Sequence, residues 1–167
     1  MPDRLTILFT NIWLVSRAGS ETVTRDLCLG MLRRGHRPIV YAPALGEVAE
    51  ELIARGVVVI DDLRKISEPP DILHAHHVIP CGEALMRFPH LPAVHTCHAF
   101  AYWMEGPAHF PQVAAYLAVD EACRDRLVQS EGIDPARVIL APNAVDLARI
   151  LPRPRPLMRQ PGPPGSV

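Results

Sequence analysis

The chain has 167 residues, 49% of them hydrophobic, and a formal net charge of -1 at pH 7. This length suits one domain, and the near-neutral charge predicts no nucleic-acid partner. No apolar run approaches the roughly 18–20 residues that span a bilayer, so no transmembrane segment is expected. The chain begins without a leader-like segment and its four cysteines form no CxxC pair, which favours a cytoplasmic protein with reduced thiols.

Short apolar runs alternate with helical patterns, beginning with an expected strand at residues 5–10. The helix that follows has Ser20 as its expected N-cap and Gly35 just after its end. Further strands are expected at residues 38–42, 57–60, 71–75, 92–96, 114–119 and 137–142, and further helices at residues 46–56, 80–88 and 121–131. Strands without polar alternation, separated by helices, are typical of a parallel sheet. The expected fold class is therefore α/β: a single Rossmann-like doubly wound parallel sheet of about seven strands, with helices on both faces.

Proline marks the end of this pattern. The last sixteen residues, PRPRPLMRQPGPPGSV, are too rich in proline for helix or sheet hydrogen bonding. The Rossmann-like domain is therefore expected at residues 1–150, followed by a Pro-rich linker or disordered tail at residues 151–167. Because PRPRP has polyproline character, a non-catalytic binding or interaction module that docks through the tail is an alternative function.

Three histidines occur in and just after the expected fourth strand, in the sequence DILHAHH. Strand alternation places His74 on a face that a helix should cover, so a buried, structural role is expected for it. His76 and His77 reach the end of the strand. Ligands of parallel α/β sheets bind beyond the carboxyl ends of the strands, so these two histidines are better placed to meet one.

A second cluster, VHTCHAF, ends the next expected strand, where Thr96 and His98 should project together. Imidazoles are common zinc ligands, which leaves a zinc-dependent hydrolase using His76, His77 and His98 as a less favoured hypothesis. Since no HExxH or CxxC frame accompanies these histidines, no metal site is expected. An imidazole that donates a hydrogen bond to a sugar hydroxyl or a phosphate is the favoured interpretation.

The segment AGSE, residues 18–21, joins the first expected strand to its helix. Free N–H groups and the helix dipole can bind an anion at such a place, and Gly19 would let a phosphate approach the backbone closely. The segment is neither a GxGxxG motif nor a Walker loop, so an ordinary turn is an equal alternative.

Taken in order, these motifs resemble the N-terminal, acceptor-side domain of a family 4 glycosyltransferase, of the retaining GT-B group. The resemblance covers about residues 5–152. AGSE with LCLGMLRRGHRPIVYAP resembles the family's first loop and helix, although Ala18 replaces a common first glycine. DILHAHH resembles its fourth strand, HTCHAF the strand with a Thr-x-His element, and AVDEACRDRLVQSEGIDPARVILAPNAVDLARILP the segment leading to the interdomain crossing.

This resemblance implies a role for each matched residue. His98 matches the family's histidine near the transferred sugar and is expected to be the catalytic residue. Gly19 and Ser20 are expected to bind the donor's diphosphate. Such enzymes usually need no metal ion, and no cofactor is expected. The residues expected to bind the acceptor are His76, His77 and Thr96, and those expected to stabilise the interdomain crossing are Asn143 and Asp146.

The resemblance also implies partners. The substrates would be a nucleotide-sugar donor and a sugar or lipid-linked acceptor, and a C-terminal donor-binding domain would be needed in cis or in trans. Without that domain the chain is expected to have little or no transferase activity, and its exposed interdomain face favours a possible homo-oligomer. A peripheral position at the membrane is a further possibility. The aromatic residues after the second cluster, Phe100, Tyr102 and Trp103, are expected to pack rather than to stack on a sugar.

Overall fold

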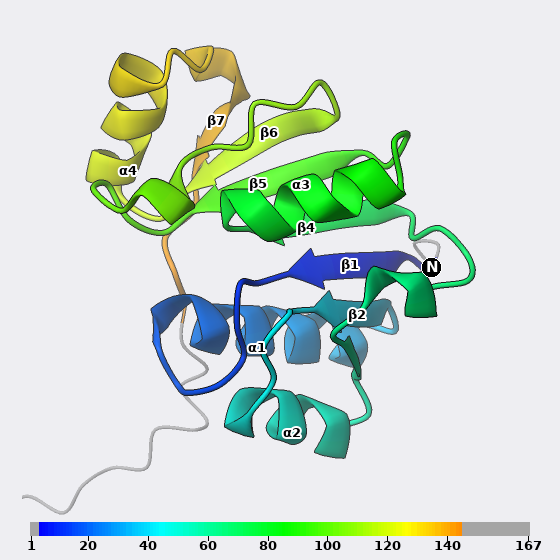
Figure 1. Ribbon diagram of the computed structural model, residues 1–167. Coiled ribbons are helices and arrows are strands. Elements are labelled where there is room, and N and C mark those ends of the chain that lie inside the picture. Colours follow the sequence, from blue (N-terminus) through cyan, green and yellow to red (C-terminus); the bar gives the residue numbers. More distant parts are fainter. Residues whose placement is uncertain (1–3, 145–167) are drawn as a thin grey trace, which may run out of the picture.

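Seven parallel strands form one twisted sheet (Figure 1). The computed structural model describes residues 4–144. The strands are β1 (Thr6–Thr10), β2 (Arg37–Tyr41), β3 (Val58–Ile60), β4 (Ile72–His76), β5 (Ala93–Cys97), β6 (Val113–Ala118) and β7 (Val138–Leu140). Their order in the sheet is β3-β2-β1-β4-β5-β6-β7, with every pairing parallel. The structure thus confirms the predicted α/β class and the single Rossmann-like sheet.

Helices cover both faces of the sheet (Figure 1). The α-helices are α1 (Gly19–Arg33), α2 (Glu47–Ala54), α3 (Val78–Arg87) and α4 (Glu121–Asp125), and α4 continues into the π-helical turn η3 (Arg126–Ser130). Three short 3-10 turns are η1 (Leu63–Lys65), η2 (Trp103–Glu105) and η4 (Pro135–Arg137).

Strand alternation divides the apolar core into two layers. Phe9 and Val40 point to the side of α1 and α2, where they pack in one buried cluster with Cys28. Leu8 and Leu73 point to the opposite side and belong to the cluster that contains α3 and α4. Side chains of a strand alternate between faces, so a sheet covered on both sides needs apolar residues at successive positions, as these strands have.

The first helix begins earlier than its sequence predicts. Its N-cap is Ala18, whose carbonyl accepts the Thr22 N–H at 3.1 Å. The Ser20 hydroxyl donates to the Glu21 carboxylate at 3.0 Å and so caps no backbone N–H, and the predicted Ser20 cap is wrong. By contrast, Asp120 caps α4 as its sequence suggests, accepting the Cys123 N–H at 2.7 Å.

A groove of about 770 Å³ runs between α1 and the strands on that side of the sheet. Its lining includes His74, Thr96 and Leu117 of three adjacent strands, together with residues 141–144. Asn143 therefore lines this groove, whereas Asp146, the expected boundary at residue 150 and the Pro-rich tail lie outside the described residues.

Candidate active site

The two histidine clusters meet at the carboxyl edge of the sheet. His76 ends β4 and pairs in register with Thr96 of β5, and His98 follows β5 directly. The Nδ1 atom of His76 lies 2.6 Å from the Nε2 atom of His98, which is a hydrogen bond between two imidazoles. The clusters therefore lie together at one edge of the sheet.

Four rings form a row from the core to this edge. Phe9, His74, His76 and His98 follow one another with ring centroids 5.2, 4.8 and 4.8 Å apart. The Nε2 atom of His74 bonds the hydroxyl of Thr96 at 2.8 Å. His74 borders the groove and is only partly buried, so the expected enclosure between sheet and helix is corrected. The reason is that α1 stands off from β4 on this face and leaves the groove between them.

A buried acid supports the third histidine of the first cluster, His77. His77 has a backbone φ of 68° and ψ of 140°, a sparsely populated conformation that costs on the order of 1–3 kcal/mol. Its Nε2 atom lies 3.0 Å from one oxygen of Glu105, and the other oxygen accepts the backbone N–H of His98 at 3.4 Å. Glu105 thus joins both clusters.

Glu105 was not singled out from the sequence. It lies in the non-periodic loop after β5, on η2, and no motif marks it. The one available signal was its type, because a carboxylate stands there among aromatic, apolar and glycine neighbours in the sequence FAYWMEGPAHF. An acid so placed becomes buried only when it has a partner.

Burial controls the charge of this site. Burial removes water from His98 and lowers its pKa to about 4, although the nearby Glu105 acts to raise this pKa. Burial likewise lowers the pKa of His74 to about 4. The pKa of His76 falls well below its ordinary value for the same reason, reinforced by the neighbouring histidines. For Glu105, burial alone would raise the pKa, but the bonds from His77 and the nearby His98 outweigh it and lower the pKa. At neutral pH the site therefore holds neutral imidazoles at positions 74, 76 and 98 beside one carboxylate.

The expected acceptor-binding residues are mostly enclosed. His76 is 0% exposed, His77 is 3% exposed and Thr96 is 4% exposed, whereas His98 is half-buried. Their side chains bond to His98, Glu105 and His74 respectively. Acceptor binding by these three residues stays a prediction, and their burial means that any contribution would pass through the groups that they hold.

The start of α1 borders the same edge of the sheet. A side chain added at Gly19 would meet nothing within 4 Å, so the backbone there is open to a ligand. The Ser20 hydroxyl is engaged by Glu21, which is itself buried. Since that carboxylate would repel a phosphate, we expect an anion to approach Gly19 rather than the Ser20 hydroxyl. Diphosphate binding at these two residues stays a prediction.

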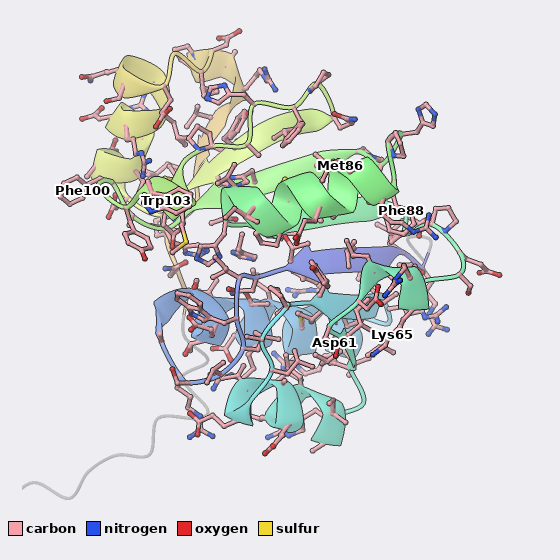
Figure 2. The ribbon with its side chains drawn as sticks, viewed as in Figure 1. Asp61, Lys65, Met86, Phe88, Phe100 and Trp103 are labelled. Atoms are coloured by element: carbon pink, nitrogen blue, oxygen red, sulfur yellow. The ribbon has the colours of Figure 1, made fainter. Side chains whose placement is uncertain are left out.

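Exposed apolar side chains surround the site. Phe100 and Trp103 are 67% and 63% exposed, and Figure 2 shows both at the same end of the molecule, on the loop after β5. Tyr102 is 48% exposed, so the prediction that Phe100, Tyr102 and Trp103 pack is wrong. Arg126 donates to the carbonyls of Ala99 and Tyr102 at 2.8 and 2.9 Å and so holds the backbone of this loop. The loops after β1 and β2 add the exposed apolar residues Trp13, Val15 and Leu45, and the first turn of α3 adds Ile79.

Within residues 4–144, no group of three His, Cys, Asp or Glu side chains is arranged so as to hold a metal ion. The histidines that a zinc hydrolase would use are bonded to one another or to Glu105: His76 to His98, and His77 to the acid. The described geometry therefore lends no support to the zinc-hydrolase hypothesis.

Comparison with protein families identifies the chain. The model of "Glycosyltransferase Family 4" matches residues 17–149, a span that contains the first loop, both histidine clusters and Glu105. The chain belongs to glycosyltransferase family 4. No curated protein sequence matches it.

Solved structures of glycosyltransferases share the fold of this family 4 chain. The crystal structure of Anabaena Alr3699/HepE in complex with UDP-glucose superposes with a TM-score of 0.64 at 16% identity, over 87% of this chain and 45% of that one. A glycosyltransferase from Rickettsia africae ESF-5 gives a TM-score of 0.64 at 16% identity, over 90% of this chain and 47% of that one. Both are GT-B proteins, and the family 4 chain corresponds to their N-terminal half. It thus spans slightly less than half of their length.

Over the described part of the family 4 chain, no helix combines the length and the apolar character needed to cross a membrane.

Proposed function

We propose that the chain is the acceptor-side half of a retaining GT-B glycosyltransferase, which transfers a sugar from a nucleotide-sugar donor to an acceptor. The observation that carries the proposal is the position of His98 within the family match. This residue stands at the carboxyl edge of the parallel sheet, half-buried, fixed by His76 and by Glu105. That edge is where doubly wound sheets bind their ligands.

A nucleotide sugar is the donor class that the comparisons favour. The structures of Anabaena Alr3699/HepE contain UDP-glucose in one case and UDP with glucose in another. In the present chain, the backbone at Gly19 is open, and the N-terminal end of α1 carries free N–H groups and the positive end of the helix dipole. Both features suit the diphosphate of such a molecule. The exposed rings of Phe100 and Trp103 suit the flat face of an acceptor sugar.

His98 would act as a neutral group. Because burial lowers its pKa to about 4, the imidazole carries no charge at neutral pH and serves as a hydrogen-bonding group near the reacting sugar. The charge of the transition state would then be stabilised mainly by groups on the donor-binding domain. Preorganised dipoles and cations stabilise such charge efficiently.

A donor-binding domain would complete the site, in cis or in trans. The chain matches only 45% and 47% of the lengths of the two structures above. The carboxyl edge carries exposed apolar side chains from several loops, Trp13 and Trp103 among them, as expected for a surface that another domain covers. We infer that the isolated chain has little or no transferase activity.

Complementation tests the proposal. The chain is mixed with the separately produced C-terminal half of a family 4 relative such as Anabaena Alr3699/HepE, and UDP release from UDP-glucose is measured with and without candidate acceptors. The expected result is turnover in the mixture and none in the chain alone. His98→Ala should lower that turnover by about 100-fold, the loss typical of one transition-state hydrogen bond.

His90→Ala is the matched control. His90 is exposed and precedes β5, at the opposite edge of the sheet from His98. Assembly is followed separately by tryptophan fluorescence, because both tryptophans of the chain, Trp13 and Trp103, lie exposed at the carboxyl edge and should shift to the blue when covered. Equal turnover of the His98→Ala and wild-type assemblies would refute the catalytic role. A blue shift without turnover for any acceptor would favour the non-catalytic binding module.

A further inference from the structure

The hydrogen bond between His76 and His98 has a definite polarity. The two rings lie within 19° of parallel and their bonded nitrogens are 2.6 Å apart. Burial keeps both rings neutral at neutral pH, so each carries a single N–H. One of the bonded nitrogens must then donate and the other accept, which leaves two arrangements.

The two arrangements differ in what they leave at the inner end of His76. If Nδ1 of His76 donates, its Nε2 atom is a bare acceptor. If Nε2 of His98 donates instead, His76 must carry its proton on Nε2 as an N–H. That Nε2 atom is buried and, among the described residues, has no hydrogen-bond partner. The neighbouring ring offers no acceptor there, because the Nε2 atom of His74 is bonded to Thr96.

An unpartnered buried N–H is rarer in proteins than an under-satisfied acceptor, since the donor forfeits its single bond. The first arrangement is therefore the stable one. His76 donates from Nδ1, His98 accepts at Nε2, and the proton of His98 resides on Nδ1. Within the described residues, no hydrogen bond engages that Nδ1 atom, so its N–H is available to a ligand.

We propose that His76 is a positioning residue that holds His98 in its Nδ1–H tautomer and so makes it a hydrogen-bond donor toward an oxygen of the bound substrate. The recipient would be a sugar hydroxyl or a phosphate oxygen, and the identity of this recipient rests on the proposed function. The tautomer itself does not. Glu105 completes the placement by accepting the backbone N–H of His98 at 3.4 Å, so the backbone and the ring of His98 are each held by one hydrogen bond.

Nitrogen NMR of the whole chain tests the proposal without an activity assay. In a sample with ¹⁵N-labelled histidine at pH 7.5, the long-range ¹H–¹⁵N correlations of His98 should show Nδ1 protonated and Nε2 bare. This is the reverse of the tautomer that free imidazole side chains favour in water. An Nε2–H signature for His98 in the wild-type chain overturns the proposal.

Two substitutions of His76 separate positioning from packing. His76→Asn keeps an N–H donor where Nδ1 stood, so His98 should retain the Nδ1–H signature. His76→Leu removes the donor, and the His98 proton should move to Nε2. In the complemented assembly, His76→Leu should lower kcat with little change in KM, and His76→Asn should recover part of the loss. An unchanged His98 tautomer in His76→Leu would also overturn the proposal.

His95→Leu is the control variant. His95 is equally buried but belongs to the opposite core layer, beside Tyr116, and should leave the His98 signature unchanged. Should His76→Leu fail to fold, the wild-type and His76→Asn spectra still decide the tautomer. Failure of transferase activity in every mixture would refute the proposed function while leaving the tautomer measurement intact, so the two outcomes are distinguishable.

Discussion

His95 is the residue of the described chain that has two buried side-chain atoms without a hydrogen-bond partner. Its side chain is 0% exposed, and neither ring nitrogen has a hydrogen-bond partner among residues 4–144. One of these nitrogens must carry a proton, and a buried unsatisfied donor costs about 1–3 kcal/mol. Burial also lowers the pKa of His95 to about 3, so the ring stays neutral.

We therefore expect His95→Leu to raise the free energy of unfolding at pH 7 by about 1 kcal/mol, since an apolar side chain of similar size removes the unsatisfied donor. Urea unfolding measures the change, with His90→Leu at an exposed loop position as the control that should stay within about 0.5 kcal/mol. A loss of more than about 1 kcal/mol in His95→Leu would mean that the ring is satisfied by a buried water, which such sites can hold.

At the scale of the elements, the loops after β1 and β2 are joined by hydrogen bonds and pack closely at Gly46. Leu14 donates to the carbonyl of Ala44 at 2.8 Å, and Gly46 and Glu47 donate back to Leu14 and Val15 at 3.1 Å. A Cβ atom at Gly46 would lie 2.8 Å from both the Cα and the carbonyl oxygen of Val15. The clash is with backbone, so relief requires one loop to move.

Gly46→Ala should accordingly lower the free energy of unfolding by about 1–3 kcal/mol. Thermal unfolding should show the loss as a fall of about 2–4 °C for each kcal/mol. Gly19→Ala is the matched control, because its added Cβ meets nothing within 4 Å and its backbone φ is ordinary, and its Tm should not fall. Equal Tm values for the two variants would contradict the close packing of these loops.

Elements with strong periodicity were predictable, and those set by distant contacts were not. Strands such as β4 stand out because local apolar runs define them, and Asp120 is a local cap. The predicted start of α1 is wrong because the Ser20 hydroxyl is bonded to the Glu21 carboxylate and does not cap a backbone N–H. The loop after β5 is shaped by Arg126, a contact 24–27 positions away that no pattern in the loop reveals.

The candidate site was predictable in its location but not in its connections. Parallel topology requires that residues after β4 and β5 meet at one edge, which is why His76 and His98 were expected together. Their direct bond and the place of Glu105 depend on side-chain orientations that strand alternation leaves undetermined. The exposure of Phe100 and Trp103 likewise follows from the held backbone of their loop rather than from their apolar character.

On the scale of the whole molecule, the two faces of the sheet differ from its carboxyl edge in the side chains that they bury. Two apolar layers stabilise the sheet, while buried polar groups are concentrated where the strands end. Among residues 4–144, Oγ1 of Thr10, Oδ1 of Asn11 and Oε1 of Glu21 have no hydrogen-bond partner. Thr10 ends β1, Asn11 follows it, and Glu21 lies in the first turn of α1. Such groups lower stability, and functional edges commonly retain them because a ligand or a water satisfies them.

The same concentration of buried histidines makes the domain sensitive to acid. Four histidines have pKa values below the ordinary 6.5: burial lowers them to about 4 for His74 and His98, to about 3 for His95, and well below 6.5 for His76. Below pH 6.5 the unfolded chain binds protons at these positions that the folded chain does not. Stability is therefore fully present above pH 6.5 and is lost as the pH falls toward the folded-state values.

Each such histidine removes up to about 1.4 kcal/mol of stability per pH unit in this window. Because a domain has only about 5–15 kcal/mol in total, the chain should unfold cooperatively near pH 5. Urea unfolding at pH 7.5, 6.5 and 5.5 should show a midpoint that falls slightly between the first two values, because the unfolded histidines are half protonated at pH 6.5, and falls steeply at the third. His95→Leu should reduce the slope of the unfolding free energy against pH by the contribution of one proton, and His90→Leu should leave this slope unchanged. A midpoint that holds steady down to pH 5 would show that the folded chain takes up these protons, and that the imidazoles at the site are charged.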